Sequence, residues 1–398
     1  MRHKIALFTP LNPIKSGISD YSEELIFELS KYVDIDIYIA RNYKPNNQDI
    51  VEQFKIYPFN IDNFDPGAYD EIVFHMGNSS QPHSYMYDAI KEFHGIVVLH
   101  DYFLQGFYAE RYFATNDFSE CSSLFTKYYS KKGEEIANYV AQRITPPIWS
   151  CEEAIDYPLN EEIISNSKAI IVHSNFIRNK ILETWNKPVI TIPHHGFIQK
   201  DFSSSQFRKK LGIKEEDLLI GSFGFVNPNK RFDVLIPTIM GLHAENIKYL
   251  IVGEDGADIL KNFIKEKSER LIILSYSPLD EFEALISSCD ICINLRYPTL
   301  GETSGSLIRM MGFGKPVLVS NVGAYAELPD YSVYKIDPDI DEAETIRRAL
   351  NALIQDKEFR ESMGREAAIY VKEFCSIKKC AKLYADFIHL NASSKRCA

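Results

Sequence analysis

A carboxylate and four small residues stand together near position 300, directly before a stretch with helical spacing. Glu302 is followed by Thr303, Ser304, Gly305 and Ser306. Because these side chains carry little bulk, backbone N–H groups at the start of the next helix can approach phosphate oxygens, and the positive end of the helix dipole attracts the anion. Glu302 can accept hydrogen bonds from sugar hydroxyl groups. The pattern favours a ligand that carries a diphosphate and a sugar; the alternative is a Gly/Ser turn with a capping carboxylate.

Two basic residues that can bind phosphate lie in a second loop. Lys230 and Arg231 belong to residues 227–233, which follow an apolar run that ends at Phe223. An ammonium group held there can stabilise negative charge on a departing diphosphate. A guanidinium group can bind phosphate oxygens through two parallel hydrogen bonds. The alternative is that both side chains are simply solvated.

Three further candidates each follow a short apolar run, which is where open α/β sheets bind ligands. They are His100, Gly17 and Tyr276. A neutral imidazole at His100 can donate or accept a hydrogen bond, whereas Gly17 allows a ligand to approach the backbone closely. Tyr276 is placed to border a nucleobase. The alternatives are a structural histidine oriented by Asp101 and a tight turn at Gly17.

Short apolar runs that alternate with helix-length segments must position these residues. The expected strands lie at residues 5–8, 35–39, 71–74, 95–99 and 169–172 in the first half, and at 218–223, 249–253, 271–274, 291–295, 317–319 and 333–336 in the second. Strands joined by crossovers predict a doubly wound parallel sheet. Two such series predict two α/β domains. Residues 102–158 read as a helical insertion that shapes the acceptor side, and residues 361–387 as helix.

The composition narrows the class of protein. The chain has 398 residues, of which 45% are hydrophobic and 25% charged, which suits about two or three globular domains. A net charge of -11 argues against a general nucleic-acid binder, because affinity for the phosphate backbone comes from Lys and Arg. The apolar runs are shorter than the ~20 residues of a membrane-spanning helix, and the run at residues 5–8 is too short for a signal-peptide core.

Seven cysteines are scattered along the chain. An odd, dispersed set fits reduced thiols better than a disulfide framework, so we expect a cytoplasmic protein. Cys289 and Cys292 have the spacing of half a zinc site, but no second Cys/His pair of that spacing accompanies them. We therefore expect no metal or redox centre.

Five segments together resemble the retaining glycosyltransferases of family 4. They are residues 9–22, 100–103, 192–196, 224–233 and 300–320. The resemblance implies the GT-B fold, in which two Rossmann-like domains with parallel sheets face each other. Residues 1–196 would form the acceptor-side domain and residues 197–374 the nucleotide-sugar domain. Residues 375–398 would form a C-terminal helix that crosses back onto the first domain.

The resemblance also implies an activity. It predicts transfer of a hexose from a nucleotide diphosphate sugar to a glycan or lipid-linked acceptor, with retention of anomeric configuration and without a metal. Residues 16–22 and 301–306 look most like the mannosyltransferases that build bacterial surface polysaccharides from GDP-mannose. Lys230 would stabilise the leaving diphosphate, while Glu302 and His100 would contact the donor sugar.

The chain departs from the family pattern at two positions. Phe225 stands where an arginine commonly follows the glycine, and Arg309 stands where a second glutamate commonly holds the ribose when the chain is aligned on residues 314–316. Arg309 could instead bind phosphate or acceptor, or be a helix-surface residue. These departures keep two alternatives open: a catalytically silent, glycosyltransferase-like binding subunit, and a phosphorylase or epimerase of the same fold.

A basic and aromatic segment suggests peripheral membrane contact. It comprises Lys127, Lys131 and Lys132 interleaved with Phe125, Tyr128 and Tyr129. Aromatic and basic groups on one helix face can bind an anionic membrane surface. The alternative is a solvated charged face.

Overall fold

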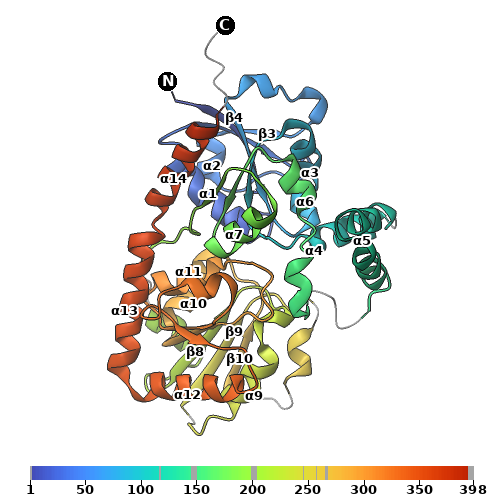
Figure 1. The fold of residues 1–398 in the computed structure, drawn as a ribbon. Helices are drawn as coiled ribbons and strands as arrows, with labels where there is room; N and C mark the ends of the chain where they lie inside the picture. Colours follow the sequence, from blue (N-terminus) through green and yellow to red (C-terminus); the bar gives the residue numbers. More distant parts are fainter. Residues whose placement is uncertain are drawn as a thin grey trace. The chain divides into compact units, whose positions relative to one another are not determined.

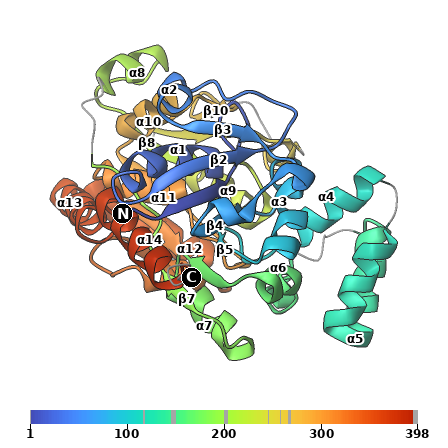
Figure 2. The ribbon, with the colours of Figure 1, turned by 90° about the horizontal axis from the view of Figure 1, so that it is seen from above.

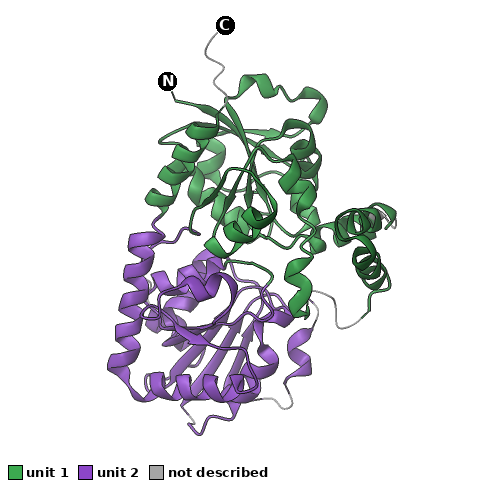
Figure 3. Cartoon of the chain, in the orientation of Figure 1, with its two compact units in different colours: residues 1–193, 300–303, 377–398 green, residues 194–299, 304–376 purple. Residues whose placement is uncertain are grey.

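The computed structural model describes residues 2–115, 118–144, 150–198, 204–244, 246–256, 258–264 and 268–392. The chain divides into two compact α/β units (Figure 3). Unit 1 comprises residues 1–193, 300–303 and 377–398, and unit 2 comprises residues 194–299 and 304–376. Each unit has its own sheet and its own hydrophobic core.

Unit 1 contains a seven-stranded sheet in which every neighbouring pair is parallel. The strand order is β3-β2-β1-β4-β5-β6-β7. The strands are β1 (Lys4–Phe8), β2 (Asp34–Ile39), β3 (Lys55–Pro58), β4 (Glu71–Met76), β5 (Ile96–Leu99), β6 (Ala169–Val172) and β7 (Val189–Thr191). The five predicted strands are confirmed. The edge strands β3 and β7 were not predicted, because they are short and at most partly buried.

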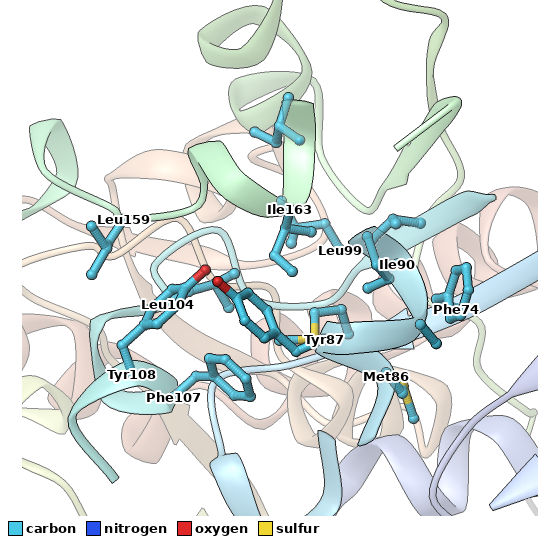
Figure 4. Packing of buried hydrophobic residues seen from close by; sticks show 14 of the residues in the cluster. Phe74, Met86, Tyr87, Ile90, Leu99, Leu104, Phe107, Tyr108, Leu159 and Ile163 are labelled. Atoms are coloured by element: carbon cyan, nitrogen blue, oxygen red, sulfur yellow. The ribbon is translucent and has the colours of Figure 1, made fainter. Parts of the chain in front are cut away.

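Helices cover both faces of this sheet (Figures 1 and 2). They are α1 (Gly17–Leu29), α2 (Gln48–Gln53), α3 (Ser80–Phe93), α4 (Gln105–Thr115), α5 (Ser119–Ala141), α6 (Glu161–Asn166), α7 (Asn175–Thr184) and α14 (Ile377–Asn391). Successive strand residues point to opposite faces, so Leu7 lies in one hydrophobic cluster and Phe8 in the other. Figure 4 shows part of the Phe8 cluster, where Tyr87 and Tyr108 pack near Ile163.

The predicted helical insertion is present as α4 and α5. Within α5 the backbone leaves helical geometry at Ser130 (φ 53°, ψ -134°), and Gly133 lies so close to Phe125 that a Cβ atom would stand 1.9 Å from its carbonyl oxygen. Phe125 is buried, and the hydroxyl of Tyr129 accepts a hydrogen bond from the Leu159 N–H at 2.6 Å. The aromatic side chains of the expected membrane segment thus contribute to the core of unit 1. Membrane contact through it stays a prediction.

Unit 2 contains a six-stranded sheet, again parallel throughout. The order is β10-β9-β8-β11-β12-β13. The strands are β8 (Leu218–Phe223), β9 (Ile247–Val252), β10 (Leu271–Leu274), β11 (Ile291–Asn294), β12 (Val317–Ser320) and β13 (Tyr334–Ile336). All six were predicted. The helices are α8 (Ser204–Lys210), α9 (Phe232–Met240), α10 (Leu279–Ser288), α11 (Gly305–Gly312), α12 (Glu342–Gln355) and α13 (Lys357–Phe374).

The strand order reverses once in each sheet, and the reversal places the candidate residues. In unit 1 it lies between β1 and β4, and in unit 2 between β8 and β11. Such sheets bind ligands outside the carboxyl ends of the strands at this point. The loops after β8 and β11 carry Lys230 and the residues around 302.

The C-terminal helix belongs to unit 1, as the fold prediction expected. α13 ends at Phe374 and α14 begins at Ile377. The carbonyl of Cys375 accepts a hydrogen bond from the Gly196 N–H at 2.8 Å. Within unit 1, the hydroxyl groups of Tyr21 on α1 and Tyr384 on α14 share a hydrogen bond of 2.8 Å.

Candidate functional site

The loop after β8 brings Lys230 back to the end of that strand. Lys230 closes a short 3-10 helix (Pro228–Lys230), and its Nζ donates to the carbonyl of Phe223 at 2.8 Å. Gly224 has φ +92°, and a Cβ atom on it would stand 3.0 Å from this Nζ and 3.6 Å from Ser306 Oγ. Glycine is needed here for both reasons, since other residues rarely adopt positive φ. The arrangement places an ammonium group beside the start of α11.

Lys230 is almost completely buried, with 5% of the residue exposed. Burial lowers the pKa of Lys230 well below its ordinary value, and the positive charge of Arg296 lowers it further. Among the described residues, no carboxylate forms an ion pair with Lys230. An uncompensated buried cation is costly, so burial favours the neutral amine, and a bound anion would favour the charged ammonium form.

Side-chain hydrogen bonds fix the first turn of α11. Ser304 is the N-cap, and its Oγ accepts from the Leu307 N–H at 3.2 Å. Asn294, at the end of β11, donates through Nδ2 to the Oγ atoms of Ser304 and Ser306, both at 3.2 Å. The two serine hydroxyls are 2.9 Å apart. The positive end of α11 is therefore held beside Lys230, which suits the binding of phosphate oxygens.

Glu302 lies in the short segment that clusters with unit 1. Its Oε2 accepts from the Leu300 N–H at 2.7 Å. Gly301 has φ +83°, and a Cβ atom on it would meet Ile177 and Tyr102. Desolvation raises the pKa of Asp101 to about 6, and the negative charge of Glu302 adds to the shift. Glu302 is therefore near the loop that follows β5, while Thr303 joins it to the N-cap of α11.

His100 lies between two other histidines. Its Nε2 is 3.3 Å from His75 Nδ1, and its Nδ1 is 3.1 Å from His173 Nε2. The three residues come from the carboxyl ends of the neighbouring strands β4, β5 and β6. Sequence reasoning missed His75 and His173, although each stands at a strand end as His100 does. Both ring nitrogens of His100 thus lie within hydrogen-bond distance of a histidine, and Asp101 accepts from the Asn78 N–H at 2.8 Å.

Gly17 opens α1, after the N-cap Ser16. It is not among the glycines with positive φ. A Cβ atom on Gly17 would have no heavy atom within 4 Å. A positive φ and close packing therefore do not explain glycine at this position, and close approach of a ligand to Gly17 stays a prediction. Asn12, in the preceding loop, is held by Glu23 Oε1, which accepts from its N–H at 2.7 Å.

The two candidate arginines are held by carboxylates of unit 2. Arg231 donates from Nε to Glu342 Oε2 at 3.0 Å. Arg309 donates from Nη1 to Glu283 Oε1 at 2.5 Å, and both side chains are largely buried. These ion pairs, which the sequence did not predict, tie each guanidinium group to the scaffold.

Arg296 and Tyr276 each follow a strand of unit 2. Arg296 lies two residues after the end of β11. It is 8% exposed, and its side chain donates to the Leu295 carbonyl at 2.8 Å. Sequence reasoning missed it, and its position just beyond a predicted strand was the available signal. Tyr276, after β10, is 41% exposed, which leaves it accessible to a ligand.

Neither a metal-binding cluster nor a membrane-spanning helix is found among the described residues. Within those ranges, no group of three or more His, Cys, Asp or Glu residues is arranged to hold a metal ion. No described helix is long and apolar enough to span a membrane.

Comparisons with known sequences point to one kind of protein. Residues 203–369 match the family model of glycosyl transferases group 1. Over 234 residues the chain is 24% identical to an uncharacterised glycosyltransferase of Methanocaldococcus jannaschii, a match that covers 54% of this chain and 57% of that protein. Over 136 residues it is 29% identical to the O-antigen biosynthesis glycosyltransferase WclY of Escherichia coli, covering 33% and 36%. The match thus spans little more than half of the Methanocaldococcus jannaschii protein and about a third of WclY.

Solved structures share the fold over nearly the whole chain. Anabaena HepE in complex with UDP-glucose has a TM-score of 0.64 at 14% identity and covers 98% of this chain and 100% of its own. Sucrose-phosphate synthase from Thermosynechococcus elongatus has a TM-score of 0.66 at 13% identity, covering 98% and 99%. WaaG, a glycosyltransferase involved in lipopolysaccharide biosynthesis, has a TM-score of 0.61 at 14% identity, covering 96% and 99%. The α/β fold with two parallel sheets is therefore of the GT-B type.

Proposed function

We propose that this protein is a retaining glycosyltransferase that transfers a hexose from a nucleotide diphosphate sugar to an acceptor hydroxyl group. The match of residues 203–369 to glycosyl transferases group 1, together with glycosyltransferase relatives, supports a transferase. We favour mannose from GDP-mannose, on the resemblance of residues 16–22 and 301–306 to bacterial mannosyltransferases. HepE is described with UDP-glucose, so UDP-sugars are the competing donors.

One observation carries the proposal: the buried ammonium group of Lys230 lies beside the first turn of α11. Gly224 keeps the space between Lys230 and Ser306 open, and Asn294 fixes the serines of that turn. A diphosphate bound there would meet a cation and backbone N–H groups together. These are the groups that stabilise charge on a departing phosphate.

The chemistry we propose is a front-face substitution. A double displacement would need a carboxylate nucleophile close beneath the anomeric carbon, and we assign none. Instead, the bond from the anomeric carbon to the diphosphate breaks while the acceptor oxygen bonds on the same face, and the acceptor proton passes to the diphosphate. Lys230 and the α11 N–H groups stabilise the leaving group, and Glu302 and His100 contact the hexose. Because the protein supplies this positive charge, we propose that turnover needs no metal or other cofactor and continues in EDTA.

The acceptor we propose is a glycan or a lipid-linked glycan in surface polysaccharide synthesis. A relative named for O-antigen biosynthesis and a structural neighbour named for lipopolysaccharide biosynthesis support this class. We place the protein in the cytoplasm, with peripheral contact at the inner face of the membrane. The six described cysteines are free thiols, which supports a reducing compartment.

A silent binding subunit is the second candidate. Arg309 stands at the aligned position of the second glutamate and is paired with Glu283, and Phe225 replaces the usual arginine and is 48% exposed. A chain that has lost part of the phosphate and ribose contacts could bind a nucleotide sugar without turning it over.

A donor panel tests the proposal and separates the candidates. The protein would be incubated with GDP-mannose, other GDP-hexoses and UDP-hexoses, with and without a cell-envelope glycolipid extract, and released nucleoside diphosphate would be measured. We expect release from one donor class, raised by the extract, and a product with the anomeric configuration of the donor by NMR. Binding of a donor without any release would favour the silent subunit, and an inverted product would contradict retention.

A further inference from the structure

Three imidazole rings form a continuous hydrogen-bonded chain in unit 1. It runs from His75 Nδ1 to His100 Nε2 at 3.3 Å, and from His100 Nδ1 to His173 Nε2 at 3.1 Å. His173 Nδ1 then lies 2.9 Å from the carbonyl oxygen of Ile192. The other end meets Ser22, whose Oγ is 2.9 Å from His75 Nδ1.

When all three histidines are neutral, the carbonyl oxygen of Ile192 determines which ring nitrogen of each histidine carries the proton. A carbonyl only accepts, so His173 must carry its proton on Nδ1, and its Nε2 is then an acceptor. His100 must in turn donate from Nδ1 to His173, which leaves His100 Nε2 without a proton. His75 must then donate from Nδ1. A single tautomer is therefore consistent with all three contacts.

Packing holds the rings in this arrangement. His75 is fully buried and His173 is 8% exposed, while His100 is partly exposed. The ring of Tyr21 contacts all three histidines, with centroid separations of 5.8, 4.8 and 5.4 Å. The Tyr21 hydroxyl is itself fixed by Tyr384 on α14. Rotation of any one ring would disturb the others.

We propose that His75 and His173 are positioning residues that hold His100 as an obligate acceptor at Nε2, ready to receive a hydroxyl proton from the sugar ligand. The inference rests on the proposed function for the identity of the ligand. The His75 N–H is closer to Ser22 Oγ, at 2.9 Å, than to His100 Nε2, at 3.3 Å. A sugar hydroxyl can replace the longer of these two contacts, whereas a ligand that presents only an acceptor oxygen cannot pair with this nitrogen.

The proton positions are measured directly by NMR of protein labelled with 15N-histidine. Long-range 1H–15N correlation separates protonated from unprotonated ring nitrogens, and single variants assign the signals. We expect His75, His100 and His173 each to be protonated at Nδ1 and unprotonated at Nε2 near pH 8 without ligand. A proton on His100 Nε2 would overturn the proposal.

Variants at His173 test the positioning role. His173→Phe removes the acceptor for the His100 Nδ1–H and should give a mixture of His100 tautomers, whereas His173→Gln can restore an acceptor oxygen and the single tautomer. Donor-dependent kcat/KM should fall roughly five- to tenfold in His173→Phe, as expected for one lost hydrogen bond, and recover in His173→Gln. His83→Gln is the matched control, because His83 is also buried and pairs with a carbonyl, that of Ser79, at 2.8 Å.

The tautomer measurement does not depend on turnover. If the donor panel shows no activity but His100 is protonated at Nδ1 only, the proposed function fails and the proton assignment stands. If the enzyme turns over a donor while the His100 tautomer is unchanged in His173→Phe, the positioning role of His173 is refuted and the proposed function stands.

Discussion

The Nζ atom of Lys230 lies 3.0 Å from the point where a Cβ atom on Gly224 would stand. Gly224 is the first residue after β8 and has φ +92°. The Nζ atom of Lys230 donates a hydrogen bond to the carbonyl of the preceding residue, Phe223. The space that the missing side chain leaves is bordered by an ammonium group and by Ser306 Oγ. This relationship is the structural basis for the anion site that we propose in unit 2.

Gly224→Ala should therefore reduce turnover through Lys230. The new Cβ would displace the ammonium group, and an alanine at positive φ costs roughly 1–2 kcal/mol in addition. Gly212→Ala is the matched control, because Gly212 has φ +69° but open space around its Cβ position. Thermal melting of both variants measures the cost of alanine at positive φ, and steady-state rates measure the additional effect of displacing Lys230. Equal rates in the two variants would contradict the role of the Gly224 space.

Glu302→Gln should keep nucleoside diphosphate binding and impair reactions of the intact donor. The amide keeps the shape and can still accept from the Leu300 N–H, but it loses the charge that strengthens hydrogen bonds to hydroxyl groups. Titration calorimetry with the nucleoside diphosphate and with the donor measures the two affinities, and Glu344→Gln on the surface of α12 is the control. Unchanged activity would leave Glu302 as a residue that only orders its own loop.

Asp101 should make stability depend on pH. Its pKa is raised in the folded state from 3.8 to about 6, so the folded protein binds more protons than the unfolded chain between these values. Stability therefore falls as pH rises through this window and is constant above it. The full effect is at most roughly 3 kcal/mol, which is the free energy equivalent to this pKa shift.

The variant Asp101→Asn isolates this effect, since its side-chain oxygen can still accept from the Asn78 N–H but does not titrate. In urea unfolding at several pH values, we expect Asp101→Asn to gain stability relative to the parent from pH 4 to pH 6 and to hold that gain at pH 8. A difference that does not change with pH would show that Asp101 is not perturbed.

Arg309→Met should destabilise unit 2 more than it weakens nucleotide binding. Its loss leaves the buried carboxylate of Glu283 uncompensated, which typically costs about 3–5 kcal/mol. Replacing both residues, as Arg309→Met with Glu283→Leu, should recover part of that loss. Lys382→Ala, which breaks an exposed pair with Asp386, is the control and should change stability little. A large loss of nucleotide affinity at unchanged melting temperature would instead make Arg309 a ligand contact.

The sequence predicted the fold well because its signals are local. Each central strand is a short apolar run between polar segments, so β1 and β8 to β13 lie where the runs indicated. The strands β3 and β7 lack this signal, because edge strands bury less surface. The break between α13 and α14 lies at residues 375–376, where the C-terminal helix was expected to begin.

The contacts within the site were less accessible to sequence reasoning, because they join residues far apart in the chain. Arg231 is held by Glu342, which lies 111 positions away. His100 is held by His75 and His173, which lie 25 and 73 positions away. A lysine and a serine in these loops predicted phosphate binding from the sequence. Only the fold reveals that Gly224 lies between Lys230 and Ser306.

The most direct test of the central claim compares Lys230→Ala with the parent protein on the donor that the panel identifies. If Lys230 acts on charge that develops at the diphosphate, turnover should fall by an amount equivalent to ~2–4 kcal/mol of transition-state stabilisation, while the dissociation constant of the nucleoside diphosphate changes far less. Lys210→Ala, on the exposed end of α8, should match the parent in both. A folded Lys230→Ala protein with full turnover would contradict the account.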